Sequence, residues 1–520
     1  MQIGGIELAL QPIPAPLPMF HGEVNPEQWS AAAGAFAQAG GRLLSLWGNE
    51  RGSNDLSVCA GYALSEGLVW LELPLVSDAA GYPDLGSQFW FAGRMQRAAM
   101  DLCGIVALGA VDTRSWLAHG AWPDGYFPLR QPAKDGTDGM TLAGTSVSDY
   151  AFVRVEGDGV HEIPVGPVHA GIIEPGHFRF SVVGEKVLRL EQRLGYTHKG
   201  IEKRFTRLEP LEAVRLAGRI SGDSTVAYAW AYSMALESAA GIDVSARASA
   251  LRAIMLERER IANHLGDLGA LGNDAGLSFG LAQFSRLRED WLRESAQIFG
   301  HRLMMDCIAP GGVRPDLDPS NAERVRRHCD AIEHEIGVLR SIYDEHAGLQ
   351  DRFIGTGTVN PSLAERLGLA GMAGRASGQA NDLRCDYRWQ PYDGLDVKMM
   401  IRRGGDVAAR VAVRFDEIGE SLRLIRALCA HLPEGNVSTE VPIPAMAARG
   451  AGWVEGWRGQ VLVALELGGA SGDRNIVRCH CHDPSWQNWP VLEHAVIGNI
   501  VPDFPLINKS FNLSYSGHDL

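Results

Sequence analysis

Two neighbouring stretches of sequence decide how the chain folds. The first is Gly195-Tyr-Thr-His-Lys-Gly-Ile-Glu-Lys203, and the second is Arg215-Leu-Ala-Gly-Arg-Ile-Ser-Gly-Asp-Ser-Thr225. A third short segment stands at the far end of the sequence and shares the small polar character of the second; it reads Asn512-Leu-Ser-Tyr-Ser-Gly-His-Asp-Leu520. The region between the second and third segments carries most of the long helical patterns of the chain.

Length and composition indicate a globular protein of two or three domains with a sizeable buried core. The chain has 520 residues, of which 46% are apolar and 21% are charged. Its formal net charge is -14 and its pI is near 5.6. A nucleic-acid partner would require a basic face, so the acidic balance argues against one.

Targeting signals are absent from the sequence pattern. No run of about 18–20 apolar residues is present to span a bilayer, and residues 1–7 lack the basic and apolar regions of a signal peptide. The eight cysteines are scattered except for Cys479 and Cys481, which suits reduced thiols. We therefore expect a cytoplasmic protein, held at the membrane face through partner subunits.

The hydrophobic patterns predict an α+β fold in two parts. Residues 1–130 form a small α/β domain, with a buried strand at 68–76 and a helix at 91–102 that Gly104 ends. Residues 131–150 are rich in Gly, Ser and Thr and read as a linker.

Residues 151–520 form the larger domain, a helical bundle with a β-rich module assembled from both of its ends. The expected helices cover residues 211–238, 246–266, 283–305, 322–345 and 406–432, and the expected strands lie at 160–193, 461–466 and 475–482.

The larger domain resembles the nickel–iron hydrogenase large-subunit superfamily, which includes the quinone-site subunit of complex I. The resemblance begins with Gly166-Pro-Val-His169 and the segment 195–203, and continues in order to the C-terminus over roughly residues 160–520. Glu174-Pro-Gly-His-Phe-Arg179 favours the membrane-bound, energy-converting branch. Further motifs of the same superfamily are Ala373-Gly-Arg-Ala-Ser-Gly378, Asp382-Leu-Arg384, Pro391-Tyr-Asp393 and Gly405-Asp-Val-Ala-Ala-Arg410.

The N-terminal domain resembles the small accessory subunit in the peripheral arm of complex I. The resemblance rests on Tyr82-Pro83, Asp101-Leu-Cys-Gly-Ile105 and Phe127-Pro-Leu-Arg130. In hydrogenases of the formate hydrogenlyase type this domain is fused ahead of the large subunit. The order of the two domains here is therefore closest to that type.

The resemblance implies that the nickel–iron centre is lost. In active hydrogenases of the superfamily two Cys-x-x-Cys pairs supply four thiolates to the metals, because soft thiolates hold low-valent nickel and bridge it to iron. The first pair falls here on Ser221 and Ser224, and the second on Ser514 and Gly517. We expect no metal in this chain and no activation of hydrogen.

The quinone site of complex I is also altered. The tyrosine that holds the quinone headgroup in that relative falls on Gly222, with Asp223 beside it. His177 can be aligned with the partner histidine of that site. Ser221, Gly222, Asp223, Ser224, Ser514 and Gly517 would line the vacated pocket, which either binds a polar ligand or is filled by water-bridged hydroxyls.

Glu202 and two histidines are the candidates for catalytic roles. In hydrogenases the glutamate of this motif passes protons away from the metal, which requires a pKa near neutrality. The alternative is a structural ion pair of Glu202 with Arg215, Arg219 or Lys203. His169 and His177 flank a β-turn; they point into the same cavity or serve as structural hydrogen-bond donors.

The run Arg478-Cys-His-Cys-His-Asp483 invites a metal-site interpretation. It follows a strand, however, so Cys479 and Cys481 face one side while His480 and His482 face the other. Consecutive residues do not readily close a tetrahedral site, and the usual Cys-x-x-Cys spacing is missing. We therefore expect these residues to be structural.

These patterns support two functional hypotheses. In the first, the chain is a non-hydrogenase large subunit of a complex I-like assembly that passes electrons to a quinone or another small acceptor, coupled to ion or proton transport. In the second, it is a catalytically silent scaffold of an ion-translocating membrane complex. The resemblance implies a small subunit with a 4Fe–4S cluster, a ferredoxin-like subunit and membrane subunits as partners.

Overall fold

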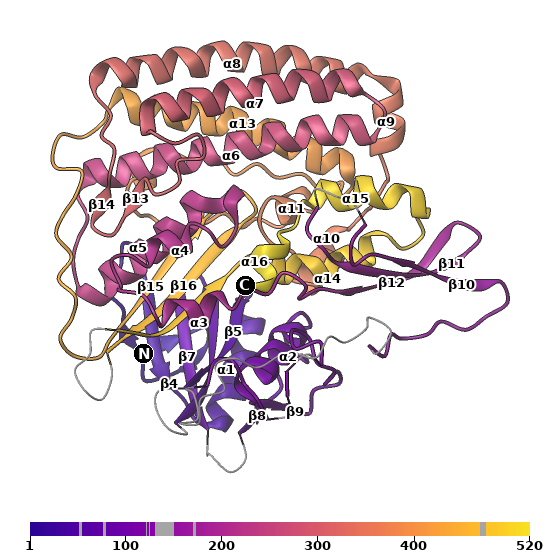
Figure 1. Ribbon diagram of the computed structural model, residues 1–520, viewed down its shortest axis with the longest axis vertical. Coiled ribbons are helices and arrows are strands. Elements are labelled where there is room, and N and C mark those ends of the chain that lie inside the picture. Colours follow the sequence, from indigo (N-terminus) through magenta and orange to yellow (C-terminus); the bar gives the residue numbers. More distant parts are fainter. Residues whose placement is uncertain are drawn as a thin grey trace.

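Five long helices form the upper part of the molecule (Figure 1). The computed structural model describes residues 1–50, 55–75, 80–120, 122–123, 125–130, 150–169, 173–468 and 475–520. The five helices are α5 (Thr225–Ala240), α6 (Ala246–Asp274), α7 (Ser278–Phe299), α8 (Pro319–Glu345) and α13 (Val407–Ala430). Helix α6 packs against α7 and α13, and α13 packs against α8. In α8 the buried residues recur every three or four positions, as an amphipathic helix requires: Ala322, Val325, Cys329, Ile332, Ile336, Leu339 and Tyr343.

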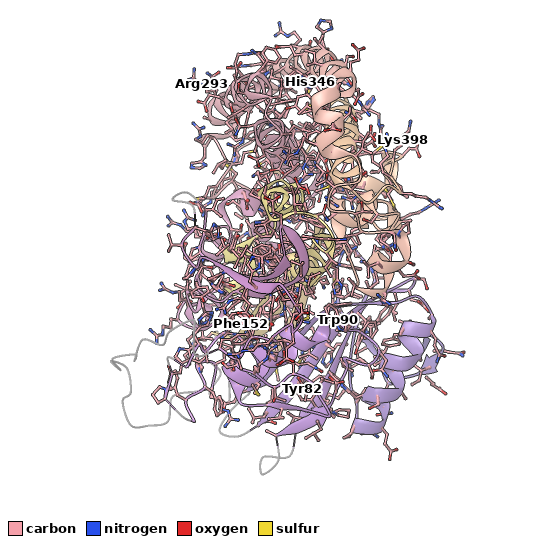
Figure 2. The ribbon with its side chains drawn as sticks, turned by 90° about the vertical axis from the view of Figure 1, so that its right-hand side faces the viewer. Tyr82, Trp90, Phe152, Arg293, His346 and Lys398 are labelled. Carbon is pink, nitrogen blue, oxygen red and sulfur yellow. The ribbon has the colours of Figure 1, made fainter. Side chains whose placement is uncertain are left out.

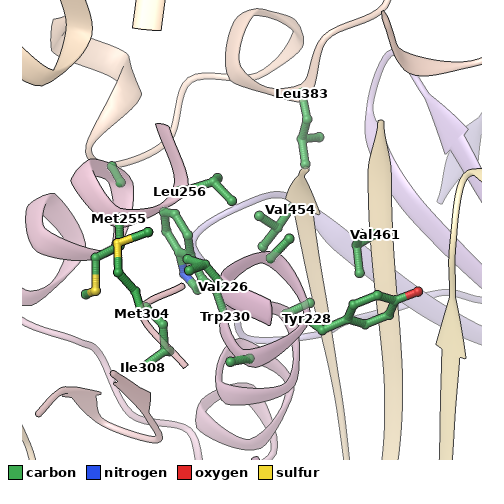
Figure 3. Close-up of a cluster of buried hydrophobic side chains, with 14 of the residues drawn as sticks. Val226, Tyr228, Trp230, Met255, Leu256, Met304, Ile308, Leu383, Val454 and Val461 are labelled. Carbon is green, nitrogen blue, oxygen red and sulfur yellow. The ribbon is translucent and has the colours of Figure 1, made fainter. Parts of the chain in front are cut away.

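An antiparallel sheet lies beneath α5. Its strands run in sequence order as β15 (Ala448–Glu455), β16 (Gln460–Leu467) and β17 (Ile476–His482). Helix α5 approaches β15 closely because Gly452 has no side chain: a Cβ there would lie 1.8 Å from the carbonyl oxygen of Ala231. Figure 3 shows the core on this side, where Trp230 of α5 and Leu256 of α6 lie near Val454 of β15.

The N-terminal part is built on a five-stranded sheet with the order β3-β4-β7-β6-β5. Strands β4 and β7 are parallel and the other pairs are antiparallel. One face carries Trp47 and Trp70 into the core shared with the helical bundle, and the other belongs to a second core with α1 and α2. The elements are β1 (Gln2–Ile3), β2 (Ile6–Glu7), β3 (Gln11–Pro12), β4 (Met19–Glu23), α1 (Pro26–Gln38), β5 (Arg42–Glu50), β6 (Leu56–Leu64), β7 (Gly67–Leu75), β8 (Gly81–Pro83), α2 (Ala92–Cys103) and β9 (Val106–Leu108).

A third sheet lies to one side of the larger domain. It contains β10 (Val160–Val165), β11 (His177–Val183) and β12 (Lys186–Arg193), and α14 (Ser485–Ala495) packs against β12. The strands from the two ends of the larger domain therefore form two separate sheets, and the single β-rich module expected from the sequence is not formed. Phe152, which precedes β10, lies between this sheet and the N-terminal domain (Figure 2).

Short elements connect these layers. They are α3 (Ile201–Phe205), α4 (Val214–Ala217), η2 (Gly222–Ser224), β13 (Ile308–Ala309), β14 (Gly312–Val313), α9 (Ala347–Phe353), α10 (Pro361–Arg366), α11 (Gly371–Ala376), α12 (Leu383–Asp386), η3 (Tyr392–Gly394), η4 (Val501–Asp503), α15 (Phe504–Phe511) and α16 (Tyr515–Asp519). In the described part of the chain, no helix is both long and apolar enough to cross a bilayer.

The structure modifies several expected elements. The helix expected at 211–238 is interrupted between α4 and α5, because a turn occupies residues 218–224. The helix expected at 246–266 continues to Asp274. Gly104 ends α2 in the left-handed conformation, with φ 66°, as expected from its place in the sequence. Residues 131–149 of the expected linker lie outside the described residues.

Candidate functional site

The interruption before α5 creates a polar turn. The amide of Ser224 donates a hydrogen bond to the carbonyl oxygen of Ser221 at 3.0 Å, and the hydroxyl of Thr225 donates to the carbonyl of Gly218 at 2.6 Å. Asn263 of α6 fixes the turn from outside by donating its side-chain amide to the backbone oxygen of Asp223 at 2.7 Å. The Ser-Gly-Asp-Ser sequence suits this geometry because small and hydrogen-bonding side chains favour turns over helix interiors.

A second turn from the C-terminal segment meets the first. Ser514 caps α16 by accepting the amide proton of Gly517 on its hydroxyl at 2.8 Å. The hydroxyl oxygens of Ser221 and Ser514 lie 3.1 Å apart, at hydrogen-bonding distance, and both side chains are buried. The fold thus brings together two segments that are 293 residues apart in the sequence.

An ion pair stands beside these hydroxyls. Both terminal nitrogens of Arg458 contact the carboxylate of Asp223, at 2.9 and 2.5 Å, and the hydroxyl of Ser221 donates to the same carboxylate at 2.6 Å. Burial raises the pKa of Asp223, but Arg458 and Ser221 outweigh that effect and hold the pKa at about 2. Nε of Arg458 donates to the backbone oxygen of Asn512 at 2.6 Å, so one guanidinium ties both turns together.

Ser224 completes this polar cluster. Its hydroxyl oxygen lies 3.1 Å from the indole nitrogen of Trp457 and 3.3 Å from a terminal nitrogen of Arg458. Trp457 and Arg458 occupy the tight turn between β15 and β16, so the sheet beneath α5 carries both groups to the site.

Gly517 has a carboxylate where a side chain would begin. A Cβ at this position would lie 2.5 Å from Oδ2 of Asp483 and 2.8 Å from the hydroxyl oxygen of Ser514. The same Oδ2 accepts a hydrogen bond from the hydroxyl of Tyr228 at 2.8 Å. Figure 3 shows the ring of Tyr228 directed from α5 towards the sheet, beside Val461. Asp483 thus fills the space next to Gly517.

Gly222 lies on the exposed rim of the cluster. A Cβ at Gly222 would meet no atom within 4 Å, so open space faces this position. A cavity of about 10 Å³ lies beside it, and Gly222, Asp223, Glu259 and Met304 are among its lining residues. Such a volume accommodates about one water molecule.

Glu202 lies in a different part of the structure. Its carboxylate accepts hydrogen bonds from Arg478 at 3.0 Å and from Nδ1 of His480 at 2.6 Å. The pKa of Glu202 is raised by burial, but Arg478 and His480 outweigh this and lower it to about 2. A proton carrier at neutral pH needs the opposite shift, so the geometry favours the ion-pair alternative for Glu202.

The cation that pairs with Glu202 differs from those expected. Arg215 pairs with Glu212 at 4.0 Å and Arg219 with Asp306 at 2.6 Å, both near the surface. The ammonium group of Lys203 donates to the backbone oxygen of Arg130 at 3.2 Å. The partner of Glu202 comes instead from β17, more than 270 residues along the chain.

The N-terminal domain completes the surroundings of Glu202. The hydroxyl of Ser45 lies 2.7 Å from Nε2 of His480, and the ring of Trp47 stacks on the same imidazole with centroids 4.4 Å apart. A largely apolar cavity of about 40 Å³ lies between the two domains and is lined by Ser45, Glu202 and His480. The ion pair therefore helps to join the fused domain to the larger one.

His169 and His177 stand apart from the serine cluster. Nδ1 of His177 lies 3.2 Å from the carbonyl oxygen of Gly166, and its ring packs against Phe152. His169 packs against Phe178. Burial lowers the pKa of both imidazoles. Among the described residues, neither histidine has a hydrogen bond to Ser221, Asp223 or Ser514.

The cysteine–histidine run lies on β17 with alternating directions. The sulfur atoms of Cys479 and Cys481 are 3.9 Å apart, while His480 points the other way, to Glu202 and Ser45. Within the ranges that the structure describes, no group of three or more His, Cys, Asp or Glu side chains is arranged to hold a metal ion. The described geometry gives these residues packing and hydrogen-bonding contacts.

Comparison with known proteins places the chain in a family. A sequence model described as "Respiratory-chain NADH dehydrogenase, 49 Kd subunit" matches residues 274–452. Formate hydrogenlyase subunit 5 of Escherichia coli (strain K12) is 31% identical over 493 residues, which cover 93% of this chain and 86% of that protein. A fused subunit of the NADH-quinone oxidoreductase of Bacteroides thetaiotaomicron is 31% identical over 79% of this chain and 78% of that protein.

The chain belongs to the superfamily of the complex I 49 kDa subunit and the nickel–iron hydrogenase large subunit. The superfamily fold is also seen in a chain of the membrane-bound sulfane sulfur reductase, an archaeal respiratory membrane complex. That chain aligns with a TM-score of 0.65 at 24% identity, over 70% of this chain and 99% of its own length.

The residues at the four cysteine positions of the superfamily do not fit a nickel–iron centre. Ser221 and Ser514 bond directly to each other, and Ser224 is engaged by Trp457 and Arg458. Gly517 offers no ligand atom, and Asp483 fills its surroundings. Hydroxyls are hard, weakly acidic donors that do not replace bridging thiolates.

Several residues of the site were missed at the level of sequence. Arg458, Asp483 and Glu259 are all far in sequence from the turn at 221–224. The Gly456-Trp-Arg-Gly459 turn and the charged run Glu257-Arg-Glu-Arg260 inside an apolar helical pattern are the signals that could have drawn attention to two of them. Nothing in the sequence pairs them with Asp223.

Proposed function

We propose that this chain is the large subunit of a complex I-like, membrane-associated respiratory complex that reduces a small acceptor without a nickel–iron centre. Electrons reach it from a 4Fe–4S cluster in a partner small subunit. A quinone or another small two-electron acceptor takes them beside Gly222 and Asp223. The names of the relatives support the setting, since they belong to a formate hydrogenlyase and to an NADH-quinone oxidoreductase.

The observation that carries this proposal is the polar, accessible rim at Gly222. Where complex I has a tyrosine, this chain has open space with an ion pair directly beside it. A site that had become mere packing would be filled by apolar side chains. Arg458 has two donors on Asp223 and lies where developing negative charge on a reduced acceptor would be stabilised.

The partner set follows from the same proposal. A ferredoxin-like subunit would deliver electrons to the small subunit, and membrane subunits would couple reduction to ion or proton movement. The chain would then be peripheral on the cytoplasmic face of the membrane, held there by its partners. His169 and His177 would border the route by which an acceptor enters, since the segment between them leads to Ser516 through Glu174 at 3.2 Å.

The test uses the complex purified in mild detergent. After chemical reduction, the iron–sulfur signals are recorded by electron paramagnetic resonance, and reoxidation is followed with a short-chain quinone or a soluble polysulfide. Gly222→Trp fills the open space without a clash and should block reoxidation. Gly337→Trp on α8, which also meets no atom within 4 Å, should leave it unchanged. Equal rates in both variants would contradict an acceptor site at Gly222.

The scaffold hypothesis remains the second candidate because the former metal site is filled from within. The Ser221–Ser514 hydrogen bond and the placement of Asp483 beside Gly517 are both found in a site that has closed. A complex without a reducible cluster, or a partner small subunit that lacks its cluster cysteines, would establish the scaffold role. A cluster that either acceptor reoxidises rapidly would exclude it.

A further inference from the structure

We propose that Glu259 supplies protons to the acceptor site at Gly222, through the water-sized cavity that both residues line. The inference rests on the proposed function and adds a proton source to it. None of the sequence motifs of the site includes Glu259, and Glu202, the residue expected to carry protons, is held in an ion pair elsewhere.

The position of Glu259 is fixed by the start of α5. Its two carboxyl oxygens accept the backbone amide protons of Val226 and Ala227, at 2.6 and 3.2 Å. Asn263, one turn further along α6, donates its side-chain amide to the backbone oxygens of both Glu259 and Asp223. The carboxyl group therefore faces the turn that carries Gly222.

Glu259 lacks the cation that other buried carboxylates of this helix have. Glu257, two residues earlier, contacts Arg384 at 2.9 Å and Arg260 at 3.1 Å, and these arginines outweigh burial and lower its pKa. In the described part of the chain, no Lys, Arg or His lies within 4 Å of the carboxyl group of Glu259. The two glutamates on one helix are thus in opposite electrostatic states.

Burial raises the pKa of Glu259 to about 8, and the nearby carboxylate of Asp223 adds to this effect. The two amide donors pull in the other direction. A group with this pKa is mostly protonated at neutral pH and can release its proton, while the same amides stabilise the carboxylate that remains.

The charged groups around Glu259 come from each element that packs against the cavity. Arg288 of α7 donates to the backbone oxygen of Ala262 at 3.0 Å, and Arg302 pairs with Glu289 at 2.6 Å. The full set comprises Asp223 from η2, Arg258 and Arg260 from α6, Arg288 from α7, Arg302 from the following loop, and Arg458 beside Asp223. These cations are engaged elsewhere, so none neutralises Glu259 directly.

The cavity provides a route for exchange with solvent. Its lining includes Gly222 on the exposed rim and Arg302, whose side chain is 50% exposed. One water in the cavity would connect the carboxyl group of Glu259 to an acceptor at the rim. Reduction of a quinone consumes two electrons, delivered singly by the iron–sulfur cluster, and two protons. Each proton that leaves Glu259 is replaced from bulk water by the same route.

The experiment uses the intact complex and compares Glu259→Gln with wild type. Glutamine keeps a carbonyl oxygen for the amides but holds no transferable proton. We expect reoxidation by the quinone to slow by about 10²-fold, and the decline in rate above pH 8 in the wild type to disappear. Glu493→Gln on α14, which removes another carboxyl whose pKa burial raises, should leave rate and pH profile unchanged.

Each outcome separates this inference from the proposed function. A wild-type complex that neither acceptor reoxidises overturns the proposed function, and this inference with it. A wild type that reacts rapidly while Glu259→Gln has the same rate and pH profile overturns only the role of Glu259. If the glutamine variant does not assemble, Glu259→Asp should move the pH midpoint of the rate, and an unmoved midpoint overturns the role. Infrared spectroscopy should show the protonated carboxyl band of Glu259 in the wild type only.

Discussion

Replacing Glu202 with glutamine should destabilise the full-length chain by about 3 kcal/mol at neutral pH. A carboxyl group whose pKa falls from 4.5 to about 2 on folding gains about this much free energy. Removing one member of a buried ion pair independently costs about 3–5 kcal/mol, since Arg478 would remain buried without its counter-charge.

The effect should depend on pH in a defined direction. Between pH 4.5 and 2 the unfolded chain binds a proton at Glu202 that the folded chain does not, so the stabilisation is fully present above the unfolded pKa and is lost as the pH falls through this range. The glutamine variant has no such proton, and the difference between the two proteins should shrink towards zero near pH 2. His480 stays neutral, because burial lowers its pKa.

The assay is urea unfolding followed by tryptophan fluorescence at several pH values. Trp47 stacks on His480 and therefore reports on this contact between the domains. Glu323→Gln, which removes an exposed partner of Arg326, serves as the control and should change stability by less than about 0.5 kcal/mol. A loss below about 1 kcal/mol for Glu202→Gln, or a loss that is the same at pH 7 and pH 3, would refute the assignment of Glu202 as a buried ionic anchor.

Three further substitutions test the packing of the site, each by the urea midpoint. Gly517→Ala should cost about 1–3 kcal/mol, because its methyl group would lie 2.5 Å from the carboxylate of Asp483; an unchanged midpoint would contradict the filled site. Arg458→Met should cost roughly 1–3 kcal/mol and raise the pKa of Asp223, whose side chain is 35% exposed; a pKa that stays near 2 would contradict the pairing. Gly452→Ala should cost at least about 3 kcal/mol, since its methyl group would overlap a backbone oxygen of α5 at 1.8 Å, and a stable variant would show that the helix and sheet can separate.

The long helices were predictable because their signals are local. Helix α13 begins after Asp406, whose carboxylate caps it, and α8 begins at Pro319 after the capping Asp318, close to the predicted starts. The predicted helix at 211–238 was wrong in its first half. Alanine and leucine favour a helix there, but Gly218 and the Ser-Gly-Asp-Ser turn break it, and contacts from α6 and from β15–β16 hold the turn in place.

The candidate site was predictable only in part. The positions Ser221, Ser224, Ser514 and Gly517 could be named because the family motifs keep their order along the chain. The structure brings Ser221 and Ser514 together but leaves His169 and His177 outside their hydrogen-bond network. Burial and charge depend on which elements pack together, so sequence reasoning could not tell that Glu202 would be ionised and paired.

The sequence by itself determined the superfamily, the order of the two domains and the loss of sulfur ligands, because these are properties of residue identity and spacing. Only the tertiary structure decided which charge meets which. Asp223 and Arg458 are 235 residues apart, and their pairing follows from the packing of α5 on the β15–β16 turn. Glu257 and Glu259 are two residues apart on one helix, yet one faces two arginines and the other faces backbone amides. A buried carboxylate is stable only where a cation or donors meet it in space, and no local pattern specifies that meeting.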